Sequence, residues 1–230
     1  MIVYHRLPFS NKQITRNIAI IANDYQNDSR WKNWLQSTDR LKYNVFFDNA
    51  VFEHCPISVD QYIRAIDEVK PSLWILPDVF GDPKSTITLT KQILPKLSPT
   101  QKAIAAVVVP FIEKTCLEEL TEILMSGISW VGVPYIQNVE RFSVVAHLIS
   151  LFPTIKIHLL GALSPFEIRL YHKIKNVKSC DTSIALTTSS KEKLFTNNEW
   201  YKETIINVAD YEDVNLHILE QNVKFLEEGI

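Results

Sequence analysis

Short apolar runs rich in β-branched residues recur along the chain, and stretches with helical spacing separate them. Near-continuous apolar runs, in contrast to alternating ones, are typical of strands in a parallel sheet that is covered on both faces. The pattern predicts eight strands, over residues 17–23, 43–47, 73–76, 104–109, 130–133, 156–160, 177–186 and 204–208.

The stretches between these runs predict helices. Ser58 is a favourable N-cap for a helix with one apolar stripe, and Pro165 stands at the first position of another helix. The pair Ser126-Gly127 marks a helix end. The expected helices cover residues 58–69, 85–97, 115–125, 138–151, 164–174 and 211–228.

Regular alternation of eight strands with helices predicts a single α/β domain over residues 1–230, a (β/α)8 barrel of the TIM type. A doubly wound open sheet would show the same alternation. The strand count and the lack of a glycine-rich first turn favour the barrel.

Composition narrows the class of protein. The formal net charge of -2 and pI near 6.3 exclude a strongly basic protein that coats nucleic acid. Three cysteines without a CxxC pair favour a reducing cytoplasm. The first residues do not resemble a signal peptide, and no apolar run approaches a membrane span, so we expect a cytoplasmic protein without a membrane partner.

Three aspartates follow predicted strands, namely Asp48, Asp78 and Asp181. In a parallel barrel, polar residues at the C-terminal strand ends meet around one opening. A carboxylate directly after a buried strand is costly to desolvate unless it is paired or used. Each aspartate could instead cap the next helix, which is the expectation for Asp82 before Pro83.

Other chemistry has weaker support. His54 and Cys55 are adjacent but lack further ligands at zinc spacing, and the glycines do not form a phosphate-binding fingerprint, so no metal or cofactor is expected. His158 is expected to lie in the core or line the site. Gly132 and Gly161 end strands where a flat ligand needs close approach to the backbone.

Five short motifs, in this order and spacing, resemble the tRNA-guanine transglycosylase superfamily: FFDNAVFE, LPDVFGD, WVGVP, HLLG and SCDTS. The likeness covers about residues 43–186 and is closest to a divergent branch that includes DNA-modifying enzymes inserting 7-deazaguanine bases. It implies a barrel enzyme with pentosyltransferase activity.

The resemblance implies a role for each matched residue. Asp181 would be the nucleophile, Asp48 the proton-transfer group and Asp78 the aspartate that recognises the base. The remaining expected substrate-binding residues are Asn49, Glu53, Gly132, His158 and Gly161. A carboxylate that attacks C1′ as the base leaves would form a covalent glycosyl-enzyme intermediate.

The implied partners are a guanine or 7-deazaguanine-type base together with DNA, RNA, or a free nucleoside or nucleotide. A homodimer or a partner subunit is compatible with the sequence. The family's three-cysteine and histidine zinc site, which helps to dock tRNA, is missing, and this disfavours tRNA as the substrate.

Other departures from the family lie at the rim of the site. The family's Gly-Gly pair is Ala50-Val51, its Gln is Glu53, and a Gln-Gly after the fourth predicted strand is replaced by Val109-Pro110-Phe111. Two alternatives therefore remain open: a catalytically inactive barrel that binds a nucleobase or nucleic acid, and an unrelated barrel hydrolase, with or without a metal ion.

Overall fold

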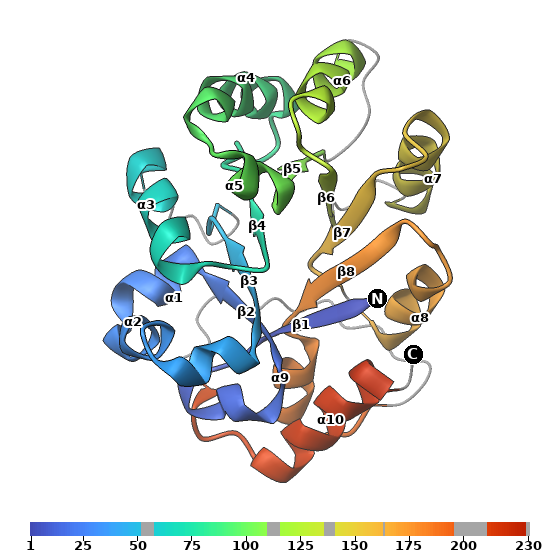
Figure 1. Cartoon of the computed structure of the whole chain (residues 1–230). Coiled ribbons are helices and arrows are strands. Elements are labelled where there is room, and N and C mark those ends of the chain that lie inside the picture. Colours follow the sequence, from blue (N-terminus) through green and yellow to red (C-terminus); the bar gives the residue numbers. More distant parts are fainter. Residues whose placement is uncertain (52–57, 110–115, 136–140, 163, 196–210, 229–230) are drawn as a thin grey trace.

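Eight parallel strands form a closed barrel in the order β1 to β8, with β8 pairing back onto β1 (Figure 1). The computed structural model describes residues 1–230 except 52–57, 110–115, 136–140, 163, 196–210 and 229–230. The strands are β1 (Ile2–Arg6), β2 (Asn17–Ile21), β3 (Asn44–Asp48), β4 (Leu73–Ile75), β5 (Ala105–Val108), β6 (Trp130–Pro134), β7 (Lys156–Leu160) and β8 (Val177–Thr182). The predicted (β/α)8 barrel is confirmed.

Helices surround the barrel in the view of Figure 1. They are α1 (Ala22–Asn27), α2 (Ser29–Leu35), α3 (Val59–Val69), α4 (Pro83–Ile93), α5 (Pro99–Ala103), α6 (Leu117–Met125), α7 (Arg141–Leu151), α8 (Pro165–His172), α9 (Ile184–Ser189) and α10 (Leu216–Glu228). Short 3-10 turns lie at Phe9–Ile14, Thr38–Lys42 and Leu94–Lys96. In the described ranges, no helix has the length and apolar character needed to cross a membrane.

Side chains begin these helices as the sequence predicts. Ser58 accepts from the backbone N–H of Gln61, whose side chain accepts from the Ser58 N–H in return. Asp82 accepts from Ser85 N, so this aspartate is a helix cap. The three predicted site aspartates are not N-caps of described helices.

One strand was not predicted, and two of the eight predicted strands need comment. The strand that was not predicted is the first of the barrel, Ile2–Arg6, because polar side chains interrupt its apolar run. The predicted strand over 204–208 lies outside the described residues. Residues 184–186 were wrongly assigned to a strand and belong to α9, because the Thr182 hydroxyl accepts from Ile184 N and turns the chain into the helix.

The apolar core has two layers. The larger layer lies between the strands and the helices, and a smaller cluster fills the barrel interior, made of Tyr4, Ala19, Phe46, Leu73, Ile75, Ala106 and Val108. Alternation along each strand sends neighbouring side chains to the two layers. The inner cluster identifies the face on which the site residues of β3, β7 and β8 lie.

A buried histidine joins β1 to the C-terminal helix on the outer side of the barrel. The Nε2 atom of His5 lies 3.6 Å from Oε1 of Glu227 in α10, and that oxygen also accepts from Thr15 Oγ1 at 2.6 Å. His5 is 0% exposed, and its burial lowers its pKa to about 3. The native state therefore holds His5 neutral.

Stability should fall in mild acid because of this histidine. Unfolded His5 binds a proton below its ordinary pKa near 6.5, whereas the folded protein takes up that proton only near pH 3. His5 therefore stabilises the fold above about pH 6.5, and the stability is lost as the pH falls toward 3. His5→Gln should make the slope of unfolding free energy shallower by up to about 1.4 kcal/mol per pH unit.

The measurement is urea unfolding between pH 4 and 7. His217 is exposed on α10, and His217→Gln is the matched control for the loss of a histidine at the surface. Equal slopes for His5→Gln and the unsubstituted protein would contradict the assignment of a neutral buried His5.

Candidate active site

The predicted carboxylates lie at the C-terminal end of the barrel. Asp48 is the last residue of β3, Asp78 follows β4, and Asp181 lies near the end of β8. In the ring order β8 is four strands from β4. Asp181 and Asp78 therefore come from opposite sides of the barrel, with Asp48 on the strand next to that of Asp78.

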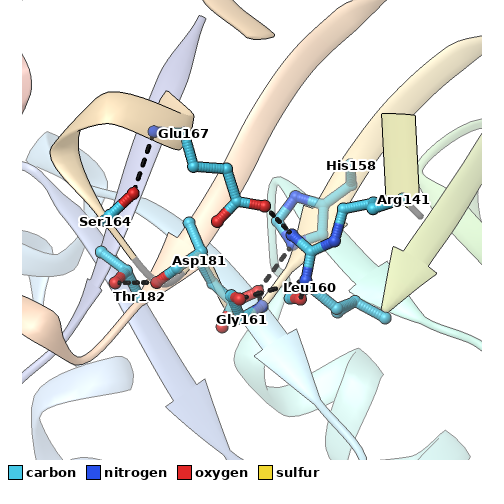
Figure 2. A network of polar contacts seen from close by, with 9 residues as sticks. Arg141, His158, Leu160, Gly161, Ser164, Glu167, Asp181 and Thr182 are labelled. Carbon is cyan, nitrogen blue, oxygen red and sulfur yellow. Dashed lines mark hydrogen bonds and ion pairs between the residues drawn. The ribbon is translucent and has the colours of Figure 1, made fainter. Parts of the chain in front are cut away.

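Two donors hold one oxygen of the Asp181 carboxylate (Figure 2). The Oδ1 atom lies 3.1 Å from Nε2 of His158 and 3.1 Å from the backbone N of Gly161. No described residue donates to the second oxygen, Oδ2. The side chain is 22% exposed. The carboxylate is thus fixed in orientation through Oδ1, and no described residue occupies the lone pairs of Oδ2.

His158 connects Asp181 to the barrel interior. Its ring is 0% exposed, and its Nδ1 lies 2.8 Å from Oγ of Ser179. Burial lowers the pKa of His158, so the ring is neutral. Since a carboxylate only accepts, His158 must donate through Nε2–H to Asp181, and the Ser179 hydroxyl then donates to Nδ1. Phe46 stacks on the ring at 4.2 Å between centroids.

A buried ion pair fixes the turn that carries the Gly161 N–H. Nη2 of Arg141 donates to the carbonyl oxygens of Leu160 at 2.9 Å and Gly161 at 3.2 Å (Figure 2). Nη1 of Arg141 lies 3.0 Å from Oε1 of Glu167, whose backbone N–H donates to Ser164 Oγ. Gly161 itself has φ +66°, a left-handed conformation that favours glycine. The first turn of α8 and the first residue of α7 therefore hold this donor in place.

The opposite side of the barrel end contains a second cluster. Asn49 donates through Nδ2 to Oδ1 of Asp78 at 2.5 Å, and burial raises the pKa of Asp78. Oδ1 of Asp48 accepts from Ala50 N at 2.9 Å. Ala50 has φ 61°, so a turn closed by Asp48 stands where the family resemblance places a glycine.

The predicted residues therefore fall into two contact groups. Asp181, His158 and Gly161 form one group, and Asn49 with Asp78 forms the other, next to Asp48. Gly132 faces the barrel interior, where an added Cβ would lie 3.2 Å from Cδ1 of Leu160. The Leu160 side chain thus occupies the space in front of Gly132. Glu53 lies outside the described residues.

Sequence reasoning missed several residues of this site. Ser179 could have been found from strand alternation, since it lies two residues before Asp181 and shares its face. Tyr4 was missed because β1 was not predicted, and no sequence signal points to the pair Arg141 and Glu167. In the part of the chain that the structure describes, no three His, Cys, Asp or Glu residues are arranged to hold a metal ion.

A family model described as "Family of unknown function (DUF6610)" matches residues 9–221, so the chain belongs to this family. The comparison with curated proteins finds no match. A 4-hydroxy-2-oxoglutarate aldolase/2-deydro-3-deoxyphosphogluconate aldolase from TTHB1 is structurally similar over 99% of this chain and 92% of that chain, with a TM-score of 0.56. Its sequence is 11% identical to this one, so the likeness supports the barrel fold alone.

Ser179→Ala tests the proton arrangement around His158. Loss of the hydroxyl leaves the buried Nδ1 without a donor, which should lower the unfolding free energy by about 1–3 kcal/mol. Ser179→Thr, which keeps a hydroxyl, is the control. In the unsubstituted protein, ¹⁵N NMR of the imidazole should show a neutral ring with the proton on Nε2. A proton on Nδ1 would contradict the arrangement.

Proposed function

We propose that the protein exchanges or cleaves a guanine-type base at the N-glycosidic bond of a nucleoside, with Asp181 as the nucleophile. The observation that carries this proposal is the setting of the Asp181 carboxylate, with Oδ1 held by His158 and Gly161 and Oδ2 accepting from no described residue. The motif likeness to the transglycosylase superfamily supports the same role for this aspartate.

The reaction follows the logic of retaining glycoside hydrolysis. Oδ2 of Asp181 attacks C1′ of the pentose, the C1′–N9 bond breaks, and its electron pair stays with the base. Asp48 supplies the proton that the departing base needs. A second base then attacks C1′ and displaces Asp181, giving its N9 proton to Asp48. Attack by water at this step would instead give hydrolysis.

Asp78 and Asn49 suit recognition of the base. The N1–H and exocyclic amine of a guanine edge both donate hydrogen bonds, and a carboxylate accepts them with charge-assisted strength. Asp78 is largely desolvated, so donors from a ligand would offset the cost of its burial. Because Asp78 lies across the barrel from Asp181, a base bound by Asp78 would lie between these two carboxylates.

Aldol chemistry fits the described strands less well. An aldolase that forms a Schiff base needs a lysine amine at the substrate carbonyl. The two lysines in the described strands, Lys156 and Lys178, lie exposed near the N-terminal ends of β7 and β8. Carboxylates occupy the opposite end, so we prefer glycosyl transfer.

An exchange assay tests the proposal. The protein is incubated with labelled guanine or 7-deazaguanine together with DNA, tRNA, guanosine or 2′-deoxyguanosine, and both incorporation and base release are measured. Asp181→Asn should lower the rate at least about 10³-fold because the amide is a poor nucleophile. Asp82→Asn is the matched control, because Asp82 caps α4 and should leave the rate unchanged.

Each outcome of the assay has a distinct meaning. Base release without incorporation identifies a hydrolase of the same site. Base binding with neither reaction supports a binding subunit and contradicts the proposed activity. Full activity in Asp181→Asn would rule out the nucleophile.

Asp48→Asn tests the proton-transfer role separately. The asparagine oxygen can still accept from Ala50 N, so the turn should persist. The rate should fall about 10²–10⁴-fold, the usual contribution of a general acid or base. The pH profile of kcat should also lose one limb. A rate and profile equal to those of the unsubstituted protein would remove Asp48 from the mechanism.

A further inference from the structure

Tyr4 enters the barrel beside the candidate nucleophile. It belongs to the inner cluster, and it is the register partner of Asp181 on the neighbouring strand. Adjacent strands lie roughly 4.8 Å apart, so the two side chains leave the sheet next to one another. Tyr4 is 3% exposed.

The Tyr4 hydroxyl has no hydrogen-bond partner among the described residues. By contrast, the hydroxyl of buried Tyr62 donates toward two carbonyl oxygens, those of Phe47 at 3.2 Å and Ile75 at 3.0 Å. Burial raises the pKa of Tyr4 to about 12, so the phenol remains a donor at neutral pH. A hydroxyl next to Asp181 that donates to no described residue is suitably placed to donate to a ligand bound there.

Two aromatic rings lie against Tyr4 in the barrel interior. Its ring lies 5.6 Å from Phe46 and 6.2 Å from His158, and these two rings stack on each other. The three rings are packed together, and one of them, His158, also contacts Asp181. The hydroxyl is the only hydrogen-bonding group of the Tyr4 side chain.

We infer that the Tyr4 hydroxyl donates a hydrogen bond to the pentose of a nucleoside bound at Asp181. The inference rests on the proposed function, because a nucleophile attacks C1′ from the face opposite the base. Groups around Asp181 therefore contact the sugar, whereas Asp78, across the barrel, contacts the base. Tyr4 is then a determinant of pentose binding and takes no part in reading the base.

Ligand affinities separate these two sides of the site. Binding of guanine, guanosine and 2′-deoxyguanosine is measured by calorimetry for the unsubstituted protein and for Tyr4→Phe. Loss of one neutral hydrogen bond should weaken both nucleosides about 3- to 10-fold and leave guanine unchanged. Asp78→Asn should weaken all three ligands, because they share the base.

Thermal unfolding gives a second readout. Because the Tyr4 hydroxyl donates to no described residue, its removal should leave Tm of Tyr4→Phe equal to, or about 2–4 °C above, that of the unsubstituted protein. Tyr62→Phe is the chemically matched control and should lower Tm, because its hydroxyl has protein partners. A gain in stability together with a loss of nucleoside affinity is not expected of a purely structural tyrosine.

The exchange assay, run in parallel, separates the two proposals. Exchange or cleavage by the unsubstituted protein, with unchanged nucleoside affinity in Tyr4→Phe, overturns the role of Tyr4 alone. A fall in Tm like that of Tyr62→Phe also overturns it. Failure of the unsubstituted protein to bind either nucleoside overturns the role of Tyr4. Nucleoside binding without exchange or cleavage overturns the proposed reaction and leaves the pentose contact standing.

Discussion

Pairing of β1 with β8 closes the barrel, and the candidate site depends on its register. Ile2 lies opposite Ser179 and Tyr4 opposite Asp181, so alternate residues of both strands point inward together. A shift of one residue would exchange the two faces of a strand. It would bring Cys180, now packed against the outer core, to the interior and send Asp181 toward the helices. Closure of the fold and presentation of the carboxylate are therefore one structural event.

An irregularity in the pairing of β7 with β8 makes the contacts of His158 with Ser179 and Asp181 possible. Ile157 lies opposite Val177, but His158 lies opposite Ser179, so the register skips one residue of β8. Regular pairing would set His158 opposite Lys178, an exposed residue near the beginning of the strand. The shift instead gives a fully buried imidazole a hydroxyl on one nitrogen and a carboxylate on the other, which satisfies both ring atoms. Such irregularities are common next to active sites, where they re-aim a side chain.

Most of the fold and about half of the candidate site could be predicted from the sequence. Apolar runs indicated seven of the described strands, because parallel strands are buried on both faces and need β-branched side chains. The first strand was not predicted because its inward Tyr4 and outward His5 are polar, and only tertiary contacts show that both are buried. Strand-end aspartates were visible as a pattern, and their partners Asn49, His158 and Gly161 were among the expected site residues. The contacts that support these partners were not predicted, because the contact of His158 with Ser179 follows from register, and that of Arg141 with Glu167 follows from how two helices begin.

The charges around the described site favour a ligand that donates hydrogen bonds. Arg141 faces Glu167 at 3.0 Å, and Arg6 lies 3.6 Å from Asp24, so both arginines are opposed by carboxylates. Asp78 and Asp181 accept from neutral donors. A phosphate at this position would have to compete with existing ion pairs and approach carboxylates, which is unfavourable in a site of low dielectric constant. A neutral nucleoside or base meets no such cost. Under the proposed function, a nucleic-acid substrate would therefore need its phosphate contacts from side chains outside this cluster.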